Sequence, residues 1–314
     1  MGTFFRRLTL FALVPFAVAI ITLLAADGRT DPYYLRFTTP RQSSLILGSS
    51  RPAQGIRPQV LDSVLRAHGK EVRSFNYGFA LGYSNYGGSY LNSILRKLDP
   101  KATDGVFVLA VDPWGVADTH SPGATAPGKA SSSFIATMKC VNMDPNIEYL
   151  LTVYDQPLLS ILFPDRNSSG GRMLLHEDGW LEVEVPMLPA EVEKRTQAKL
   201  KEYRTQRLPG AAISAVRTGY LALTIDTLQE HGTVLLVRLP VDPRMLALED
   251  SFAPHFNKLM QAVSRSKGVE YLDFSGEGSS WAYTDGNHLA PESGAGVTAV
   301  IAEHLAKVMD GTQQ

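Results

Sequence analysis

Residues 44–51, with the sequence SLILGSSR, join a short apolar run to a glycine and two serines. Such a run predicts a buried strand that ends in a turn at Gly48. Similar apolar runs recur at 105–111 (GVFVLAV) and 233–239 (TVLLVRL). Strands that are apolar along their whole length are typical of a parallel sheet that is covered on both faces.

Weaker strand patterns and helical spacings fill most of the remaining chain. We expect two further strands at 72–77 and 269–274. Helical periodicity predicts helices over 58–68, 89–98, 190–206, 211–231, 245–267 and 291–309. Five strands alternating with helices predict an α/β domain of three layers, built on one parallel sheet.

Regular patterning is lost between residues 115 and 188. This stretch includes SPGATAPGKASSS (121–133), and LEVEVP (181–186) alternates like a hairpin or an edge strand. We interpret 115–188 as an insertion in an α/β domain that covers 43–314. Residues 27–42 are expected to form a polar connector to the N-terminal segment.

The N-terminal segment, residues 1–26, is predicted to anchor the protein in a membrane. Residues 8–26 contain nineteen uncharged residues. A helix of that length spans about 28 Å, close to the roughly 30 Å of a bilayer core. Arg6 and Arg7 favour a cytoplasmic N-terminus, which leaves the domain on the other side. A cleaved signal peptide is the alternative, and the protein would then be secreted.

Composition excludes several classes of protein. Of 314 residues, 44% are hydrophobic, which argues against a wholly disordered chain. The net charge of −1 does not favour a nucleic-acid partner. Cys140 is the single cysteine, so an internal disulfide is impossible. The histidines lack metal-ligand spacing and no nucleotide-binding glycine motif is present, so we predict neither metal nor cofactor.

Polar residues follow the predicted strands at the sheet edge where ligands bind in parallel sheets. They are Ser50, Arg51, Asn76, Gly82, Asp112, Asp285 and His288. A serine nucleophile needs a base, and the base needs an orienting group. Asp285 and His288 are three residues apart, so the carboxylate can orient the imidazole toward Ser50. Taken singly, a Gly-Ser-Ser turn is typical of a helix N-cap, and an Asp-x-x-His pair is common on surfaces.

The order of these motifs resembles that of the SGNH/GDSL hydrolase superfamily, over residues 43–114 and 210–310. The resemblance implies a flavodoxin-like fold with Ser50, Asp285 and His288 as the catalytic triad, Ser49 replacing the family's aspartate. It implies an oxyanion hole formed by the N–H groups of Ser50 and Gly82, with Gly78 as the second candidate for the glycine. Asp112 stands where the family has an asparagine donor, and a carboxylate cannot donate to an oxyanion.

Four residues are candidates for substrate binding: Arg51, Asn76, Asp112 and Trp281. Arg51 suits an anionic or sugar substrate, and the alternative is a solvated charge at a helix start. Trp281 lies close to Asp285 in sequence and offers a face for stacking on a sugar, and the alternative is simple packing.

The N-terminal anchor and the Gly-Ser-Ser motif together resemble membrane-anchored SGNH-like proteins that accompany bacterial cell-surface acylation. This resemblance implies an inner-membrane serine esterase or O-acyltransferase that acts on acylated envelope glycan, with a membrane-bound O-acyltransferase as partner. The rival interpretation is a non-catalytic scaffold or glycan-binding subunit on the same fold. A soluble, lipoprotein-like carrier is a third interpretation, which a cleaved N-terminus would favour.

Overall fold

The computed structural model describes residues 2–28, 30–118, 134–163 and 171–311. At its centre is a five-stranded sheet in which every neighbouring pair is parallel. The strand order is β2-β1-β3-β8-β9. The strands are β1 (Ser44–Leu47), β2 (Ser74–Asn76), β3 (Gly105–Ala110), β8 (Gly232–Arg238) and β9 (Glu270–Asp273). The predicted α/β class and five-stranded parallel sheet are therefore confirmed.

Alternate strand residues enter two separate cores, because successive side chains of a strand point to opposite faces. On one face, Ile46, Val108 and Val237 pack in a core that includes residues of α4 (Pro58–Ala67) and α13 (Pro291–Gly311). The other face carries Leu47, Leu109 and Leu236. Their core includes residues of three helices: α6 (Gly88–Lys97), α10 (Ala215–Gln229) and α12 (Phe256–Lys267).

Further elements surround the sheet. The helices among them are α2 (Leu35–Thr38), α3 (Ser50–Gly55), α5 (Leu81–Ser84), α7 (Phe134–Thr137), α8 (Ile147–Thr152), α9 (Pro189–Glu202) and α11 (Pro243–Phe252). The 3-10 helices are η1 (Pro113–Val116), η2 (Leu158–Ile161) and η4 (Ser275–Ser280), and η3 (Tyr203–Arg207) is a π-helical segment. Two antiparallel pairs complete the list: β4 (Ala117–Asp118) with β7 (Ala212–Ile213), and β5 (Arg172–Leu175) with β6 (Leu181–Glu184).

The alternating segment at 181–186 therefore belongs to a hairpin, as predicted. The predicted insertion also contains short helices and the strand β4. Its Pro- and Gly-rich stretch 121–133 lies outside the described residues.

Two predicted helices differ from those observed. The single helix expected over 245–267 is two helices, α11 and α12, because Pro254 lacks the N–H that a continuous helix requires. The helix expected over 211–231 begins only at Ala215. Ser214 caps it by accepting a hydrogen bond from the Arg217 backbone N–H at 3.4 Å.

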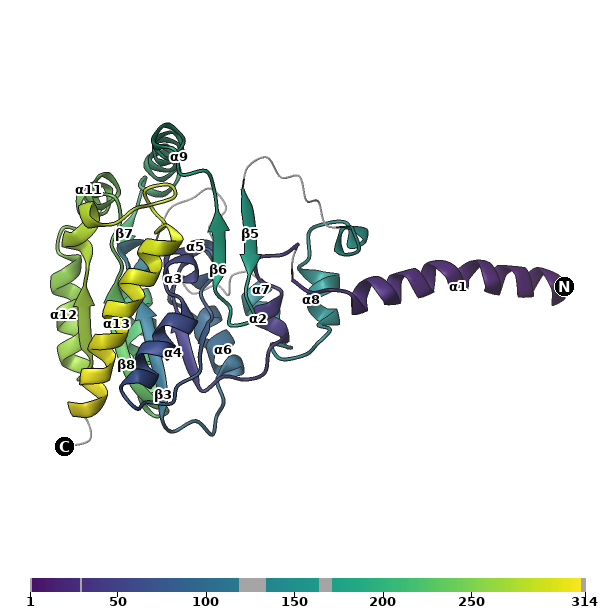
Figure 1. Cartoon of the computed structure of the whole chain (residues 1–314), viewed down its shortest axis with the longest axis horizontal. Helices are drawn as coiled ribbons and strands as arrows, with labels where there is room; N and C mark the ends of the chain where they lie inside the picture. The colour runs from purple at the N-terminus through teal and green to yellow at the C-terminus, as the bar shows by residue number, and fades with distance from the viewer. Residues whose placement is uncertain (1, 29, 119–133, 164–170, 312–314) are drawn as a thin grey trace.

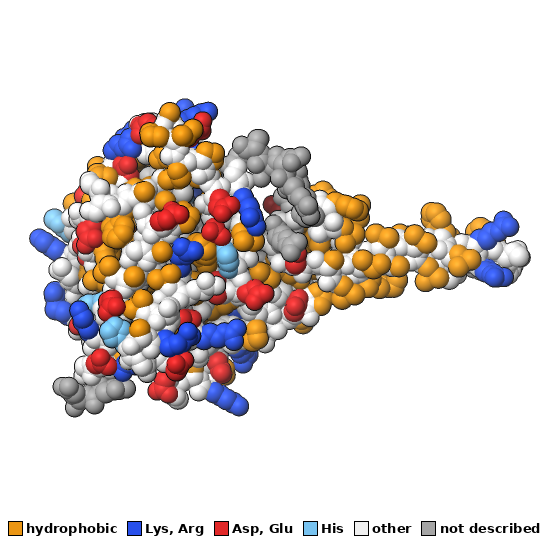
Figure 2. Space-filling model, viewed as in Figure 1, with side chains coloured by type: hydrophobic (Ala, Val, Ile, Leu, Met, Phe, Trp, Pro, Cys, Tyr) orange, Lys and Arg blue, Asp and Glu red, His pale blue; other side chains and the backbone are white. Residues whose placement is uncertain are grey.

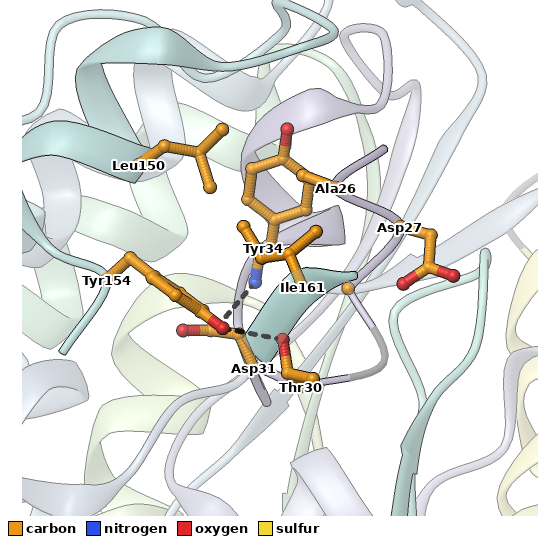
Figure 3. A pocket seen from close by; sticks show the side chains of 9 residues that line it. Ala26, Asp27, Thr30, Asp31, Tyr34, Leu150, Tyr154 and Ile161 are labelled. Atoms are coloured by element: carbon orange, nitrogen blue, oxygen red, sulfur yellow. Dashed lines mark hydrogen bonds between the residues drawn. The ribbon is translucent and has the colours of Figure 1, made fainter. Parts of the chain in front are cut away.

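Part of the predicted connector, 27–42, belongs to the folded domain. Tyr34 and Phe37 are fully buried. Asp31 accepts hydrogen bonds from the Tyr34 N–H at 2.9 Å and the Tyr149 hydroxyl at 2.7 Å. Asp31 and Tyr34 also line a cavity of about 10 Å³, room for one water molecule, at the base of the N-terminal helix (Figure 3). Its sequence predicts a connector because the residues that enter the core are interspersed with charged residues and prolines.

The N-terminal helix α1 (Gly2–Leu24) projects away from the domain (Figure 1). It is the one helix among the described residues that is long and apolar enough to cross a membrane. Its side chains are almost all exposed, and basic side chains gather at its far tip (Figure 2). An apolar helix with so little of its surface buried differs from a core helix of a soluble domain.

Candidate active site

The turn after β1 depends on Gly48. Its φ is +130°, and a Cβ there would lie 2.7 Å from the Ala110 carbonyl oxygen on β3. Glycine alone adopts this conformation at such close range without strain. The turn leads directly into α3, where Ser49 is the N-cap and Ser50 is the first helical residue. Ser50 therefore lies at the carboxyl end of a central strand.

The structure brings Ser50, His288 and Asp285 together. Ser50 Oγ lies 2.8 Å from His288 Nε2, and His288 Nδ1 lies 2.9 Å from Asp285 Oδ2. The carboxylate accepts only, so Nδ1 carries the proton and Nε2 is free to accept the Ser50 proton. His288 is buried, whereas Ser50 is half-buried. The serine hydroxyl is therefore hydrogen-bonded to its base, close to the protein surface.

The loop that carries His288 is shaped by Asp285. Asp285 Oδ1 accepts hydrogen bonds from the backbone N–H groups of Asn287 at 3.0 Å and His288 at 2.9 Å. Between them, Gly286 has a φ of +76°, which the tight turn requires. The Thr284 N–H donates to the His288 carbonyl at 2.9 Å and closes the loop. One carboxylate thus fixes both the loop and the imidazole.

The electrostatics of the Asp285 carboxyl favour its charged form. Burial alone would raise its pKa, but the charge and hydrogen bond of His288 and the N–H of Asn287 lower it by more. The net result is a pKa well below the usual range for an aspartate. Asp285 is therefore ionised and is suited to stabilise an imidazolium at His288.

Close packing of α3 against α13 brings the serine and the histidine loop together. A Cβ on Gly294 of α13 would lie 2.9 Å from the Gly55 carbonyl oxygen at the end of α3. The Arg57 N–H donates to Thr298 Oγ1 at 3.1 Å. Ser50 begins α3 and His288 lies just before α13, so this contact sets the distance between them.

The sequence suggested that Arg51 either binds substrate or is a solvated charge at a helix start. In the structure its guanidinium is buried and paired inside the protein. It is 5% exposed, and its Nη2 lies 2.6 Å from Glu249 Oε1. Its Nε and Nη2 donate to Asn287 Oδ1 at 3.1 and 2.8 Å. Glu249 also pairs with Arg238 at 2.8 Å. Burial alone would lower the pKa of the Arg51 guanidinium, but the charges of Glu249 and Asp112 raise it above its ordinary value.

Both carboxylate oxygens of Asp112 have partners inside the protein. Its Oδ1 accepts from the Gly115 N–H at 3.0 Å and caps η1. Its Oδ2 accepts from Ser49 Oγ at 3.2 Å, and Arg51 Nη1 lies 3.9 Å away. The carboxylate thus joins the end of β3 to the N-cap of α3. Contact between Asp112 and substrate stays a prediction.

Asn76 is likewise structural, because every polar atom of its side chain is used inside the protein. It is completely buried, and its Nδ2 donates to the carbonyls of Pro52 at 2.8 Å and Ile56 at 2.9 Å. Its Oδ1 accepts from the Gly78 N–H at 3.1 Å. The Gly78 N–H is therefore occupied, which excludes the second candidate for the oxyanion glycine. Gly82 lies exposed on α5.

Trp281 packs against α13. It is half-buried, and a Cβ on Gly296 would lie 2.9 Å from Trp281 Cζ3. Its ring belongs to the edge of the core on the α13 face. The packing interpretation therefore accounts for Trp281, and stacking on a sugar stays a prediction for its exposed part.

Sequence reasoning missed Glu249, Arg238 and Asn287. Arg238 interrupts an otherwise apolar strand, which was a usable signal that a buried partner exists. Glu249 lies within a helix that carries other charges, so nothing in its sequence distinguished it. Asn287 stands between the two matched residues of the Asp-x-x-His motif.

Comparison with protein-family models finds no match, and no curated protein matches the chain significantly.

Proposed function

We propose that the protein is a serine esterase or O-acyltransferase of the SGNH type that acts on acylated cell-surface glycan. The observation that carries the proposal is the connected chain from Ser50 Oγ through His288 to Asp285, with distances of 2.8 and 2.9 Å. Ser50 is half-buried, so a substrate carbonyl has access to its hydroxyl.

In the proposed reaction, Ser50 Oγ attacks an acyl carbonyl and passes its proton to His288 Nε2. Asp285 stabilises the resulting imidazolium. The tetrahedral intermediate collapses, the leaving alkoxide takes the proton from His288, and an acyl-enzyme remains on Ser50. Water as acceptor makes the protein an esterase, and a sugar hydroxyl makes it a transferase. The N–H groups of Ser50 and Gly82 are the proposed oxyanion donors.

The strand order supports the finer fold assignment. Numbered within the sheet, β2-β1-β3-β8-β9 is 2-1-3-4-5, the order of flavodoxin-like sheets. In such sheets ligands bind where the order reverses, between the first and third strands. Ser50 follows β1, and Asp112 follows β3. We therefore assign the protein a flavodoxin-like, three-layer fold with its active site at that crevice.

We further propose that α1 anchors the protein in the bacterial inner membrane, with the domain outside the cytoplasm. The support is the 23-residue apolar helix, nearly all of it exposed, with Arg6 and Arg7 near its free end. A membrane-bound O-acyltransferase that supplies acyl groups is the proposed partner. If α1 is instead a cleaved signal, the mature protein lacks its first residues.

A scaffold or glycan-binding subunit is the second candidate. Asp112 favours it, because this residue stands in place of the family's asparagine donor and its carboxylate is occupied by Gly115 and Ser49. The intact chain from Ser50 to Asp285 favours the enzyme.

Labelling with a fluorophosphonate probe tests the proposal. The full chain is used in detergent micelles, with Ser50→Ala and His288→Ala as test variants. Ser266→Ala, an exposed serine on α12, is the matched control. We expect labelling of the unaltered protein and of Ser266→Ala, and its loss in both site variants. Absent labelling of the well-folded unaltered protein would favour the scaffold, and labelling that survives Ser50→Ala would refute the triad.

A further inference from the structure

The side chain of Asn287 lies between Arg51 and His288. It is 2% exposed. Its Oδ1 accepts two hydrogen bonds from Arg51, at 3.1 and 2.8 Å. Its Nδ2 lies 3.2 Å from His288 Nε2, the nitrogen that also faces Ser50 Oγ. A buried amide therefore stands directly beside the atoms of the proposed reaction.

Arg51 determines which way this amide faces. A guanidinium carries only donors, so the atom of Asn287 that faces Arg51 must be the oxygen. The NH₂ group is therefore directed toward His288. Arg51 is itself held by Glu249 at 2.6 Å, and Glu249 is completely buried. The donor at the active site is thus fixed by an ion pair that substrate does not touch.

Two donors share one acceptor at His288. Nδ1 faces Asp285, so Nε2 has a single lone pair, and both Ser50 Oγ–H and Asn287 Nδ2–H approach it. When Nε2 takes the serine proton, it becomes a donor and no longer accepts from Asn287. The Asn287 N–H is then released in the same step that places negative charge on the substrate oxygen.

We infer that Asn287 is a catalytic residue that donates its Nδ2–H to the oxyanion, and that Arg51 is the positioning residue that orients it. The inference rests on the proposed function. Nδ2 and Ser50 Oγ both contact Nε2, at 3.2 and 2.8 Å, so they are within about 6 Å of each other. The oxyanion oxygen is bonded to the same carbon atom as Oγ. It can therefore lie between Oγ and Nδ2, within hydrogen-bond distance of Nδ2.

The reaction balances with Asn287 as a donor only. The Oγ–C bond forms, the serine proton moves to Nε2, and the carbonyl π pair becomes the oxyanion that accepts from Nδ2. On collapse the π bond re-forms, the leaving alkoxide takes the proton from Nε2, and Asn287 again faces Nε2. Asn287 gains and loses no proton. Its donor therefore interacts most strongly in the transition state, as an oxyanion donor must.

Hydrolysis of p-nitrophenyl acetate by the full chain tests the inference, with Asn287→Ala compared with Asn92→Ala, an exposed asparagine on α6. We expect Asn287→Ala to lower kcat by about 10²–10³-fold while KM changes less than about threefold. Asn92→Ala should match the unaltered protein.

Arg51→Lys keeps a charge beside Glu249 but loses the two-pronged contact with Asn287. We expect it to lower kcat less than Asn287→Ala does, again with little change in KM. A kcat unchanged in Asn287→Ala would overturn the inference alone. A rise in KM as large as the fall in kcat, in both variants, would assign Asn287 a purely structural role and overturn the inference. An unaltered protein that neither labels nor hydrolyses would overturn the proposed function, and the role of Asn287 with it.

Discussion

Gly294 on α13 lies so close to Gly55 on α3 that a Cβ on Gly294 would stand 2.9 Å from the Gly55 carbonyl oxygen. The obstacle is backbone, so it cannot rotate away as a side chain does. Because Ser50 begins α3 and His288 lies just before α13, this contact controls how closely the serine and its base approach. The proposed chemistry at one end of the sheet therefore depends on two glycines that take no part in it.

Gly294→Ala should separate the two helices. We expect it to lower the free energy of unfolding by about 1–3 kcal/mol, as overpacking does, and to slow fluorophosphonate labelling. Denaturant unfolding and labelling rates measure both effects. Gly219→Ala is the matched control, because Gly219 is an exposed helical glycine whose Cβ would meet nothing within 4 Å. It should be neutral or stabilising by about 0.5–1 kcal/mol. Equal effects of the two substitutions would contradict this account of the contact.

Glu249 balances two buried guanidinium groups, those of Arg51 and Arg238. Glu249→Gln should destabilise the protein by about 3–5 kcal/mol, because it leaves buried charge without compensation. Glu303→Gln, which removes an exposed pair with His68, should change stability by no more than about 0.5 kcal/mol. Urea unfolding of both variants measures the difference. A Glu249→Gln protein as stable as Glu303→Gln would rule out a role for this cluster in stability.

Asp285 should make stability depend on acid pH. Its pKa is lowered in the folded state, so its contribution is present above its unfolded value of 3.8 and is lost as the pH falls below that value. Asp285→Asn should lower the free energy of unfolding by about 1–3 kcal/mol at pH 6. The gap to the unaltered protein should narrow as the pH falls below about 4. Unfolding curves across this range provide the measurement, and a gap that stays constant with pH would argue against the ionised carboxylate.

Lys97 should make stability rise with pH as well, but in the alkaline range. Its ammonium group donates to the Thr39 carbonyl at 2.6 Å and the Val141 carbonyl at 2.9 Å, and burial lowers its pKa from 10.5 to about 7. The unfolded chain therefore binds more protons between these two values, and stability should rise with pH by up to about 1.4 kcal/mol per unit. Lys97→Met should lack this rise. Parallel stability curves for the two proteins between pH 7 and 10 would contradict the prediction.

The fold was largely predictable because its central strands are apolar along their length. The runs at 44–47, 105–111 and 233–239 match β1, β3 and β8 to within one residue at each end. Residues 27–42 were harder, since Tyr34 and Phe37 are core residues separated by the buried Arg36. Arg36 is buried because its guanidinium donates to backbone carbonyls such as that of Asn76, at 3.1 Å. The sequence alone does not indicate these partners.

The site was predictable where its residues are close in sequence and follow strands. Ser50, Asp285 and His288 lie together as expected. The buried ion pair of Arg51 could not be predicted, because its partner Glu249 lies in a distant helix and helical periodicity does not show which residues of separate elements face each other. The hydrogen bonds of Asn76 were unpredictable for a similar reason, since its amide donates to carbonyls at the end of α3. In both cases the sequence does not show which polar residues, far apart along the chain, pair in the folded protein.

Peptide mapping of the fluorophosphonate adduct tests the central claim most directly. The full chain is labelled in detergent, digested and sequenced by mass spectrometry, with His288→Ala treated in parallel. An activated Ser50 predicts a single adduct on Ser50 in the unaltered protein and none in His288→Ala. An adduct on another residue, or an equal yield on Ser50 without His288, would contradict the account.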